Sequence, residues 1–183
     1  SVVPRGIDRS VDRPWDQALA RRLFGMPAGR LVMFSAARGL NAPQKGGRVV
    51  RRIMARLRHE LPDTTLVVMG GTAPEVSEDE GAVHYLGRLH DDAARALAFS
   101  AVDALLMPSE GESFGNVVLE ALACGTPVVA YAPGATPSLL DDAACVSAVP
   151  IGDEAALADA LHPSREGASS GTGVVGQAST RAG

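Results

Sequence analysis

Residues 103–131 read DALLMPSEGESFGNVVLEALACGTPVVAY, and this stretch decides the fold. It begins with an apolar run at 103–108, continues through a polar loop, and then places apolar residues at helical spacing over 116–124. A second apolar run follows at 127–131. Continuous apolar runs that flank an amphipathic helix are typical of a strand–helix–strand unit whose strands are buried on both faces. This part of the sequence therefore predicts a piece of a parallel sheet.

The same alternation extends along most of the chain. Apolar runs predict further strands at 31–36, 65–70 and 82–87, with a weaker one at 144–149. Helical patterns occur between them, at 16–24, 46–60, 91–99, 136–141 and 153–161. We expect an α/β fold in which a Rossmann-like parallel sheet carries helices on both faces. In such sheets ligands bind outside the carboxyl ends of the strands.

The composition excludes several classes of protein. Of the 183 residues 46% are apolar and 21% are charged, and the net charge is -4, as in ordinary soluble globular proteins that do not bind nucleic acid. No apolar run approaches the roughly 18–20 residues of a membrane span, and the first residues do not form the apolar core of a signal peptide. Cys124 and Cys145 stand in apolar surroundings, so both are expected to be core residues of a reducing compartment.

The predicted helix at 46–60 has two different faces. Val50, Ile53 and Leu57 fall on one apolar stripe, whereas several arginines lie elsewhere on the helix. The basic face is interpreted as solvated, and contact with an anionic membrane or a substrate is the alternative.

The last residues, 163–183, are rich in Gly, Ser, Ala and Thr and have no periodicity, which indicates a disordered tail. The GTGVVG sequence at 171–176 matches a dinucleotide fingerprint, but it follows no strand and opens no helix, so we assign it no role.

Two glutamates flank the loop before the predicted helix at 116–124. Glu112 lies in the loop and Glu120 about one turn inside the helix, and residues 113–116 form the helix N-terminus. Free backbone N–H groups at such a terminus suit a phosphate or a sugar oxygen, and a carboxylate can accept two hydrogen bonds from a vicinal diol. The alternative is structural: Glu112 caps the helix, and Glu120 pairs with a surface arginine.

The sequence PSEGESFGNVVLEALACGTPVVA resembles the signature of retaining glycosyltransferases of the GT-B fold, family 4 or "group 1". Residues 1–15 look like the linker between the two domains of that family, and Gln44-Lys45-Gly46 looks like its Lys-Gly motif. The resemblance covers residues 1 to about 161. It implies the C-terminal half of a GT-B fold, with a nucleotide-sugar-binding Rossmann-like domain at 16–162.

The resemblance also implies a role for each matching residue. Glu120 would hold the ribose hydroxyls, Glu112 would contact the donor sugar, and Lys45 would bind the diphosphate, where charge builds up as the nucleotide leaves. Tyr85–Arg88 and Gly70-Gly71 correspond to places where the family meets the nucleobase. Glu112 and Lys45 are thus the expected catalytic residues, and the expected donor-binding residues are Glu120, Ser113, Phe114, Gly115, Asn116 and Arg38.

We expect no cofactor and no metal, since the chain has no Asp-x-Asp motif and no His or Cys ligand spacing. The donor is expected to be linked to UDP or GDP. The resemblance implies that a separate N-terminal domain carries the acceptor site, so the chain alone is expected to be inactive. It further implies a cytoplasmic enzyme of polysaccharide biosynthesis, with membrane contact through the full-length protein at the inner face.

Two other functions stay open at this point. One is a nucleotide-binding module or degenerate half-enzyme without catalysis. The other is a different GT-B protein, such as an epimerase or phosphorylase, which should show a catalytic histidine or a cofactor lysine. The histidines are scattered and are expected to be structural or at the surface; they are His59, His84, His90 and His162.

Overall fold

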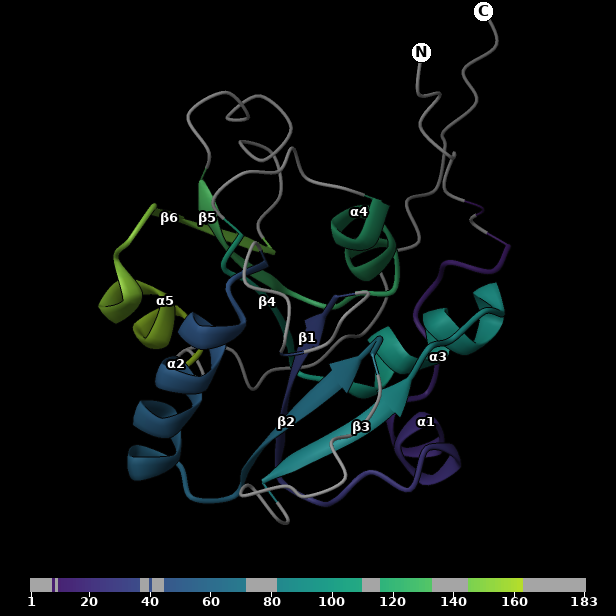
Figure 1. Ribbon diagram of the computed structural model, residues 1–183. Helices are drawn as coiled ribbons and strands as arrows, with labels where there is room; N and C mark the ends of the chain where they lie inside the picture. Colours follow the sequence, from purple (N-terminus) through teal and green to yellow (C-terminus); the bar gives the residue numbers. More distant parts are fainter. Residues whose placement is uncertain are drawn as a thin grey trace, which may run out of the picture.

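Six strands form one parallel sheet in the computed structural model, which describes residues 8, 10–36, 40, 45–71, 82–109, 116–132 and 145–162 (Figure 1). The strands are β1 (Arg30–Ser35), β2 (Thr64–Met69), β3 (Val83–Gly87), β4 (Ala104–Met107), β5 (Val128–Ala132) and β6 (Val146–Pro150). Their order across the sheet is β3-β2-β1-β4-β5-β6, and all neighbours are parallel. This order is that of a Rossmann fold, so the predicted fold is confirmed.

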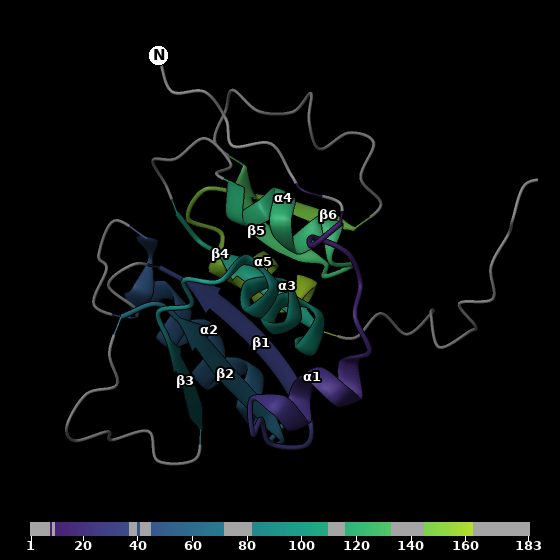
Figure 2. The same cartoon turned by 90° about the vertical axis from the view of Figure 1, so that its right-hand side faces the viewer.

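Helices cover both faces of the sheet. α2 (Gly47–Glu60) and α5 (Glu154–Ala160) pack together on one face. The other face carries α1 (Gln17–Leu23), α3 (Asp92–Ala101) and α4 (Asn116–Ala123), which Figure 2 shows in front of the sheet. All six predicted strands and five of the six predicted helices are confirmed to within about two residues at each end. The helix predicted at 136–141 and the tail predicted at 163–183 lie outside the described residues.

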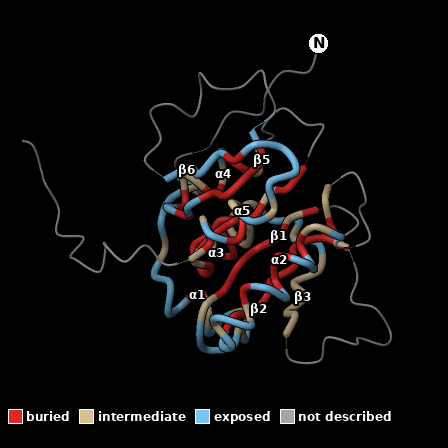
Figure 3. Tube along the Cα trace, turned by 90° about the vertical axis from the view of Figure 1, so that its left-hand side faces the viewer, coloured by how far each residue is buried: buried red, intermediate tan, exposed pale blue. Residues whose placement is uncertain are grey.

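The central strands are buried on both faces, as their continuous apolar sequences predict. Every residue of β2 is buried, as are four of the six residues of β1 (Figure 3). In β6 only Val149 is buried, because this strand forms an edge of the sheet. Cys145 precedes β6 and is exposed, whereas Cys124 is buried. The prediction that both cysteines belong to the core is therefore wrong for Cys145.

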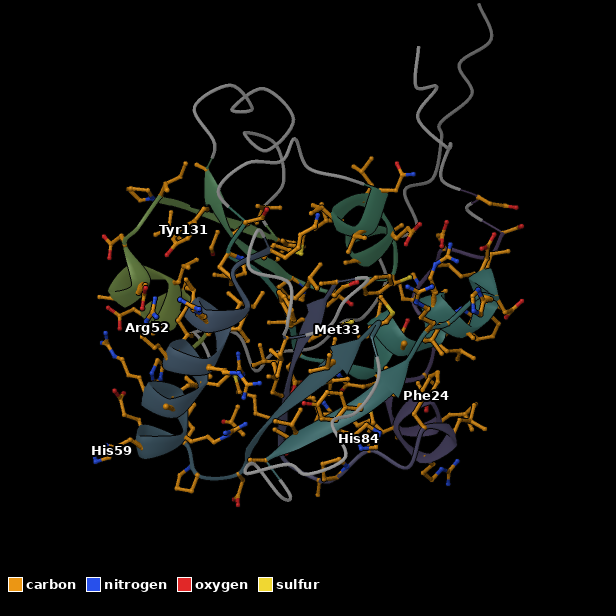
Figure 4. The ribbon with its side chains drawn as sticks, viewed as in Figure 1. Phe24, Met33, Arg52, His59, His84 and Tyr131 are labelled. Carbon is orange, nitrogen blue, oxygen red and sulfur yellow. The ribbon has the colours of Figure 1, made fainter. Side chains whose placement is uncertain are left out.

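The arginine face of α2 is joined in part to α5. Arg52 donates from Nε to an Oε atom of Glu154 at 2.9 Å, and Arg56 lies 2.9 Å from an Oδ atom of Asp159. In Figure 4, Arg52 lies on the side of α2 that faces α5. The apolar stripe of α2 is buried as predicted, with Val50, Ile53, Met54 and Leu57 in the core. Both observations agree with a solvated basic face that makes exposed ion pairs.

Asp103 connects three elements at the amino edge of the sheet by hydrogen bonds. Its carboxylate accepts two hydrogen bonds from Arg21 of α1, at 2.9 and 3.0 Å, and a third from the backbone N–H of Leu31 at 2.7 Å. These bonds join α1, β1 and the start of β4. Near the amino end of β3, Nε2 of His84 lies 3.1 Å from the carbonyl oxygen of Phe24 (Figure 4). This contact is structural, as expected for the histidines.

The end of the linker-like segment lies against α3. The backbone N–H of Trp15 donates to Oγ of Ser100 at 3.1 Å, and the guanidinium of Arg13 lies 4.0 Å from the centre of the Trp15 ring. Val11 also packs against the apolar cluster on this face. Residues 11–15 are thus held on the Rossmann-like domain, and the predicted boundary at residue 15 stays a prediction.

Candidate functional site

A pocket of about 370 Å³ lies at the carboxyl edge of the sheet. Its walls come from the ends of β1 and β2, the segment after β3, and the helices α3 and α4. The lining residues are Ser35, Ala36, Met69, Gly70, Arg88, Leu89, His90, Arg95, Asn116, Val117 and Glu120. Because the sheet reverses its winding between β1 and β4, this pocket lies at the position where open α/β sheets bind ligands.

Two of the predicted donor-binding residues lie together in the pocket wall. Asn116 is the first residue of α4, and Glu120 follows one turn later. The side chain of Glu120 is only 15% exposed. The apolar residues of this segment recur at helical spacing, and Val118 and Ala121 pack the helix onto the sheet. Asn116, Val117 and Glu120 of the same helix line the pocket.

The other candidates before α4 cannot be placed. The predicted site residues Glu112, Ser113, Phe114 and Gly115 lie outside the described residues, and so does Arg38. Their roles stay predictions.

The Lys-Gly motif lies at the start of α2, on the opposite face of the sheet from α4. Gly46 is the N-cap of α2 and has φ of 77°, and an added Cβ would collide with the carbonyl oxygen of Pro108. A Cβ on Gly47 would collide with the carbonyl oxygen of Leu40. The start of α2 therefore packs directly on the end of the β4 segment. Lys45 directly precedes Gly46 and so lies near the carboxyl end of β4, although it does not line the pocket.

Glu120 is paired with an arginine that the sequence did not indicate. Nη2 of Arg95, on α3, lies 3.4 Å from Oε1 of Glu120 and 2.8 Å from Oδ1 of Asp92. Burial lowers the pKa of the Arg95 guanidinium, but the carboxylates of Glu120 and Asp92 outweigh this effect, so the pKa is raised above its usual value. The alternative expectation was that Glu120 pairs with a surface arginine. The pairing with an arginine agrees with it, but the surface position does not. The pair exists, but both side chains are largely buried and both line the pocket.

The floor of the pocket includes a glycine turn after β2. Gly70 and Gly71 have φ of 96° and 70°, and the Gly70 N–H donates to the carbonyl oxygen of Gly87 at 2.7 Å. Gly70 and Arg88, two of the residues expected to lie near a nucleobase, line the pocket, and their contact with a base stays a prediction. Tyr85 does not, since it packs against the apolar cluster under α2.

Sequence reasoning missed several pocket residues. His90 was expected to be structural or at the surface; it is exposed and also lines the pocket. Ser35 and Ala36 end a strand, and this position was the only sequence signal for them. Arg95 gave no signal, because its spacing from Asp92 is that of a local ion pair on a solvated helix.

Two further features of the described residues bear on the kind of site. Within the described ranges, no three His, Cys, Asp or Glu side chains gather as metal ligands. Among the same residues, no helix has the length and hydropathy that crossing a bilayer requires.

Comparison with known proteins decides the family. The family model described as "Glycosyl transferases group 1" matches residues 30–163. The chain belongs to this family. Its resemblance to group 1 glycosyltransferases is thereby confirmed, and the sheet agrees with the structures of GT-B members.

Among the group 1 relatives is a D-inositol 3-phosphate glycosyltransferase of Stackebrandtia nassauensis. It is 37% identical over 156 residues, a match that covers 78% of this chain and 35% of the relative. The chain thus spans about a third of the length of the curated relatives that it matches.

Two solved structures show the shared fold. Sucrose-phosphate synthase from Thermosynechococcus elongatus is 29% identical, with a TM-score of 0.67 over 86% of this chain and 41% of that one. HepE from Anabaena, in complex with UDP-glucose, is 23% identical, with a TM-score of 0.68 over 85% of this chain and 45% of that one.

Proposed function

We propose that this chain is the donor-binding domain of a retaining glycosyltransferase and that it binds a nucleotide-diphosphate sugar. The observation that carries the proposal is the carboxylate of Glu120, which lies in the wall of a pocket at the carboxyl edge of the sheet. A largely buried carboxylate in a cavity suits a ligand that donates hydrogen bonds in pairs, as the ribose diol does.

The start of α4 in the pocket wall would supply part of the complement for the diphosphate. α4 starts at Asn116, and the first N–H groups of a helix carry a partial positive charge that favours phosphate oxygens. Lys45 lies before the start of α2, near the carboxyl end of β4. Fixed positive groups on both sides would stabilise the charge that develops on the leaving nucleotide, so we propose that transfer uses neither a metal nor another cofactor.

The retaining mechanism and the role of Glu112 at the donor sugar follow from the family resemblance. Recognition of the acceptor is proposed to depend on the part of the relatives that this match does not cover. On this proposal the chain alone binds donor but does not transfer sugar, and the complete enzyme acts in the cytoplasm, with membrane contact at the inner face. Sugar transfer catalysed by the purified chain would contradict this part of the proposal.

Calorimetric titration with UDP, GDP, ADP and dTDP tests donor binding directly. UDP is titrated first, because HepE, which shares the fold, has been solved with UDP-glucose. We expect saturable binding of one nucleotide, and we expect Glu120→Gln to weaken it by about tenfold or more, which corresponds to 1.4 kcal/mol.

Glu154→Gln is the matched control for this titration. It removes the same charge on α5, where Glu154 pairs with Arg52 and does not line the pocket. The affinity of this control should match that of the parent chain. The proposal fails if a folded chain binds none of the four nucleotides, or if both variants bind equally well.

A nucleotide-binding module without catalysis is the second candidate, because the described pocket accounts for ligand binding alone. Both candidates predict nucleotide binding. They differ in a transfer assay in which the chain is fused to the acceptor domain of a group 1 relative: turnover of a nucleotide-sugar supports the glycosyltransferase, and binding without turnover supports the module.

A further inference from the structure

Arg95 joins two helices across the wall of the pocket. It extends from α3 toward α4, and its Nη2 atom lies 3.4 Å from Oε1 of Glu120. The same nitrogen lies 2.8 Å from Oδ1 of Asp92, one turn earlier on α3. Arg95 is 20% exposed and Glu120 15%, whereas Asp92 is 49% exposed. The inner pair is thus partly buried in the pocket wall, and the outer carboxylate is more exposed.

Burial changes what this pair can do. An exposed ion pair contributes little to stability and lets both side chains move. A partly buried pair interacts more strongly and restricts the rotamers of both partners. A carboxylate has about four acceptor positions on its two oxygens. The contact with Arg95 uses Oε1 of Glu120, so acceptor positions remain for a ligand with two adjacent hydroxyl groups.

We infer that Arg95 is a positioning residue that holds the Glu120 carboxylate ready to receive the vicinal 2′- and 3′-hydroxyl groups of a ribonucleotide. The inference rests on the proposed function, and it adds to that function both a residue and a source of selectivity. Asp92 anchors the guanidinium from its own helix, so that the contact between α3 and α4 sets the direction of the carboxylate.

A direct role of Arg95 at the phosphates would have a different consequence. A guanidinium that binds phosphate contributes to affinity whether or not the ligand carries ribose hydroxyls, and whether or not Glu120 is present. A guanidinium that acts through Glu120 contributes only when both the carboxylate and the diol are present. The two roles are therefore separable by changing the ligand and the residue together.

The test measures the affinities of UDP and of 2′,3′-dideoxy-UDP, or of GDP and its dideoxy analogue if the chain prefers guanine. The proteins are the parent chain, Arg95→Gln, Glu120→Gln and the double variant. We expect Arg95→Gln to weaken UDP binding by about fivefold to tenfold and dideoxy-UDP binding by less than about twofold. In the Glu120→Gln background the further loss on removing Arg95 should also stay below about twofold.

Two more variants complete the experiment. Arg95→Lys keeps the charge near Glu120 and should restore at least part of the preference for UDP over the dideoxy ligand. Arg22→Gln removes an exposed arginine of α1 that does not line the pocket, and it should leave both affinities unchanged. Thermal unfolding of each variant shows that it is folded.

Three results would overturn the inference. Equal losses for the two ligands would place Arg95 at the phosphates or the base, and an undiminished loss in the Glu120→Gln background would show that Arg95 does not act through Glu120. Both results leave the proposed function intact, because UDP still binds. Absence of binding by every folded protein would refute the proposed function itself, and the inference with it.

Discussion

Replacing Gly46 by alanine should destabilise the domain at one identifiable contact. Gly46 has φ of 77°, in the left-handed region that a residue with a Cβ rarely adopts. The added Cβ would also lie 2.9 Å from Cγ of Pro108, and nearer still to the carbonyl oxygen of that residue. The neighbouring atoms are mainly backbone, so they cannot rotate away as the end of a flexible side chain would.

The two costs can be separated with a second glycine. Gly152 has φ of 87°, but a Cβ added there would meet nothing within 4 Å. The Gly152→Ala variant therefore carries the backbone cost alone, about 1–2 kcal/mol. The Gly46→Ala variant adds the cost of forcing extra volume into a packed site, about 1–3 kcal/mol more. We expect its total loss in the free energy of unfolding to be about 2–5 kcal/mol.

Urea unfolding followed by far-ultraviolet circular dichroism measures both variants against the parent chain. The midpoint of Gly46→Ala should lie clearly below that of Gly152→Ala, with similar slopes. If the two variants lose equal stability, the close approach of α2 to Pro108 does not exist in solution. The nucleotide affinity of Gly46→Ala provides a second readout, because a displaced Pro108 moves the chain that leads into the residues before α4.

The remaining predictions concern other parts of the domain. Asp103→Ala leaves Nη2 of Arg21 and the backbone N–H of Leu31 without their acceptor, so it should lower the free energy of unfolding by about 2–3 kcal/mol; Asp159→Ala removes an exposed pair and should change it by less than about 1 kcal/mol. If urea unfolding shows that Asp103→Ala and Asp159→Ala lower the free energy of unfolding equally, this prediction is wrong. A thiol reagent at pH 8 should modify Cys145 rapidly and Cys124 only on unfolding, because burial raises the pKa of the Cys124 thiol to about 11. Rapid modification of two thiols per folded chain would refute this. The folded chain keeps the Cys124 proton to a higher pH than the unfolded chain. The free energy of unfolding should therefore decrease as the pH rises from 9.0, the usual pKa of a thiol, to about 11. A Cys124→Ser variant should not show this decrease.

The strands and helices were predictable because burial leaves a direct pattern in the sequence. β2 is buried at every position and appears as an unbroken apolar run, and the stripe of α2 has helical spacing. β6 gave a weak signal for the same reason, since an edge strand with one buried residue has little apolar pattern to show. The order of the strands could not be predicted in the same way, because it depends on where each crossover helix packs and not on any single segment.

The site was predictable where one segment carries it and not where two segments meet. Asn116 and Glu120 belong to one motif, and the structure places both in the pocket wall. Arg95 lies on another helix, and only the packing of α3 beside α4 brings it to Glu120. The sequence placed Gly46 and Gly47 at the start of a helix, but it gave no sign that neighbouring carbonyl groups leave no room for a Cβ at either position.

The pairing of α2 with α5 sets the order in which the chain can fold during synthesis. The two helices pack on the same face of the sheet although about a hundred residues separate them. Until residues 154–160 leave the ribosome, the part of the apolar stripe of α2 that α5 covers stays open to other chains. An intermediate that ends before α5 therefore exposes hydrophobic surface, and this surface is a target for chaperones and a site of aggregation. Synthesis of α5 is thus the step that covers this part of α2.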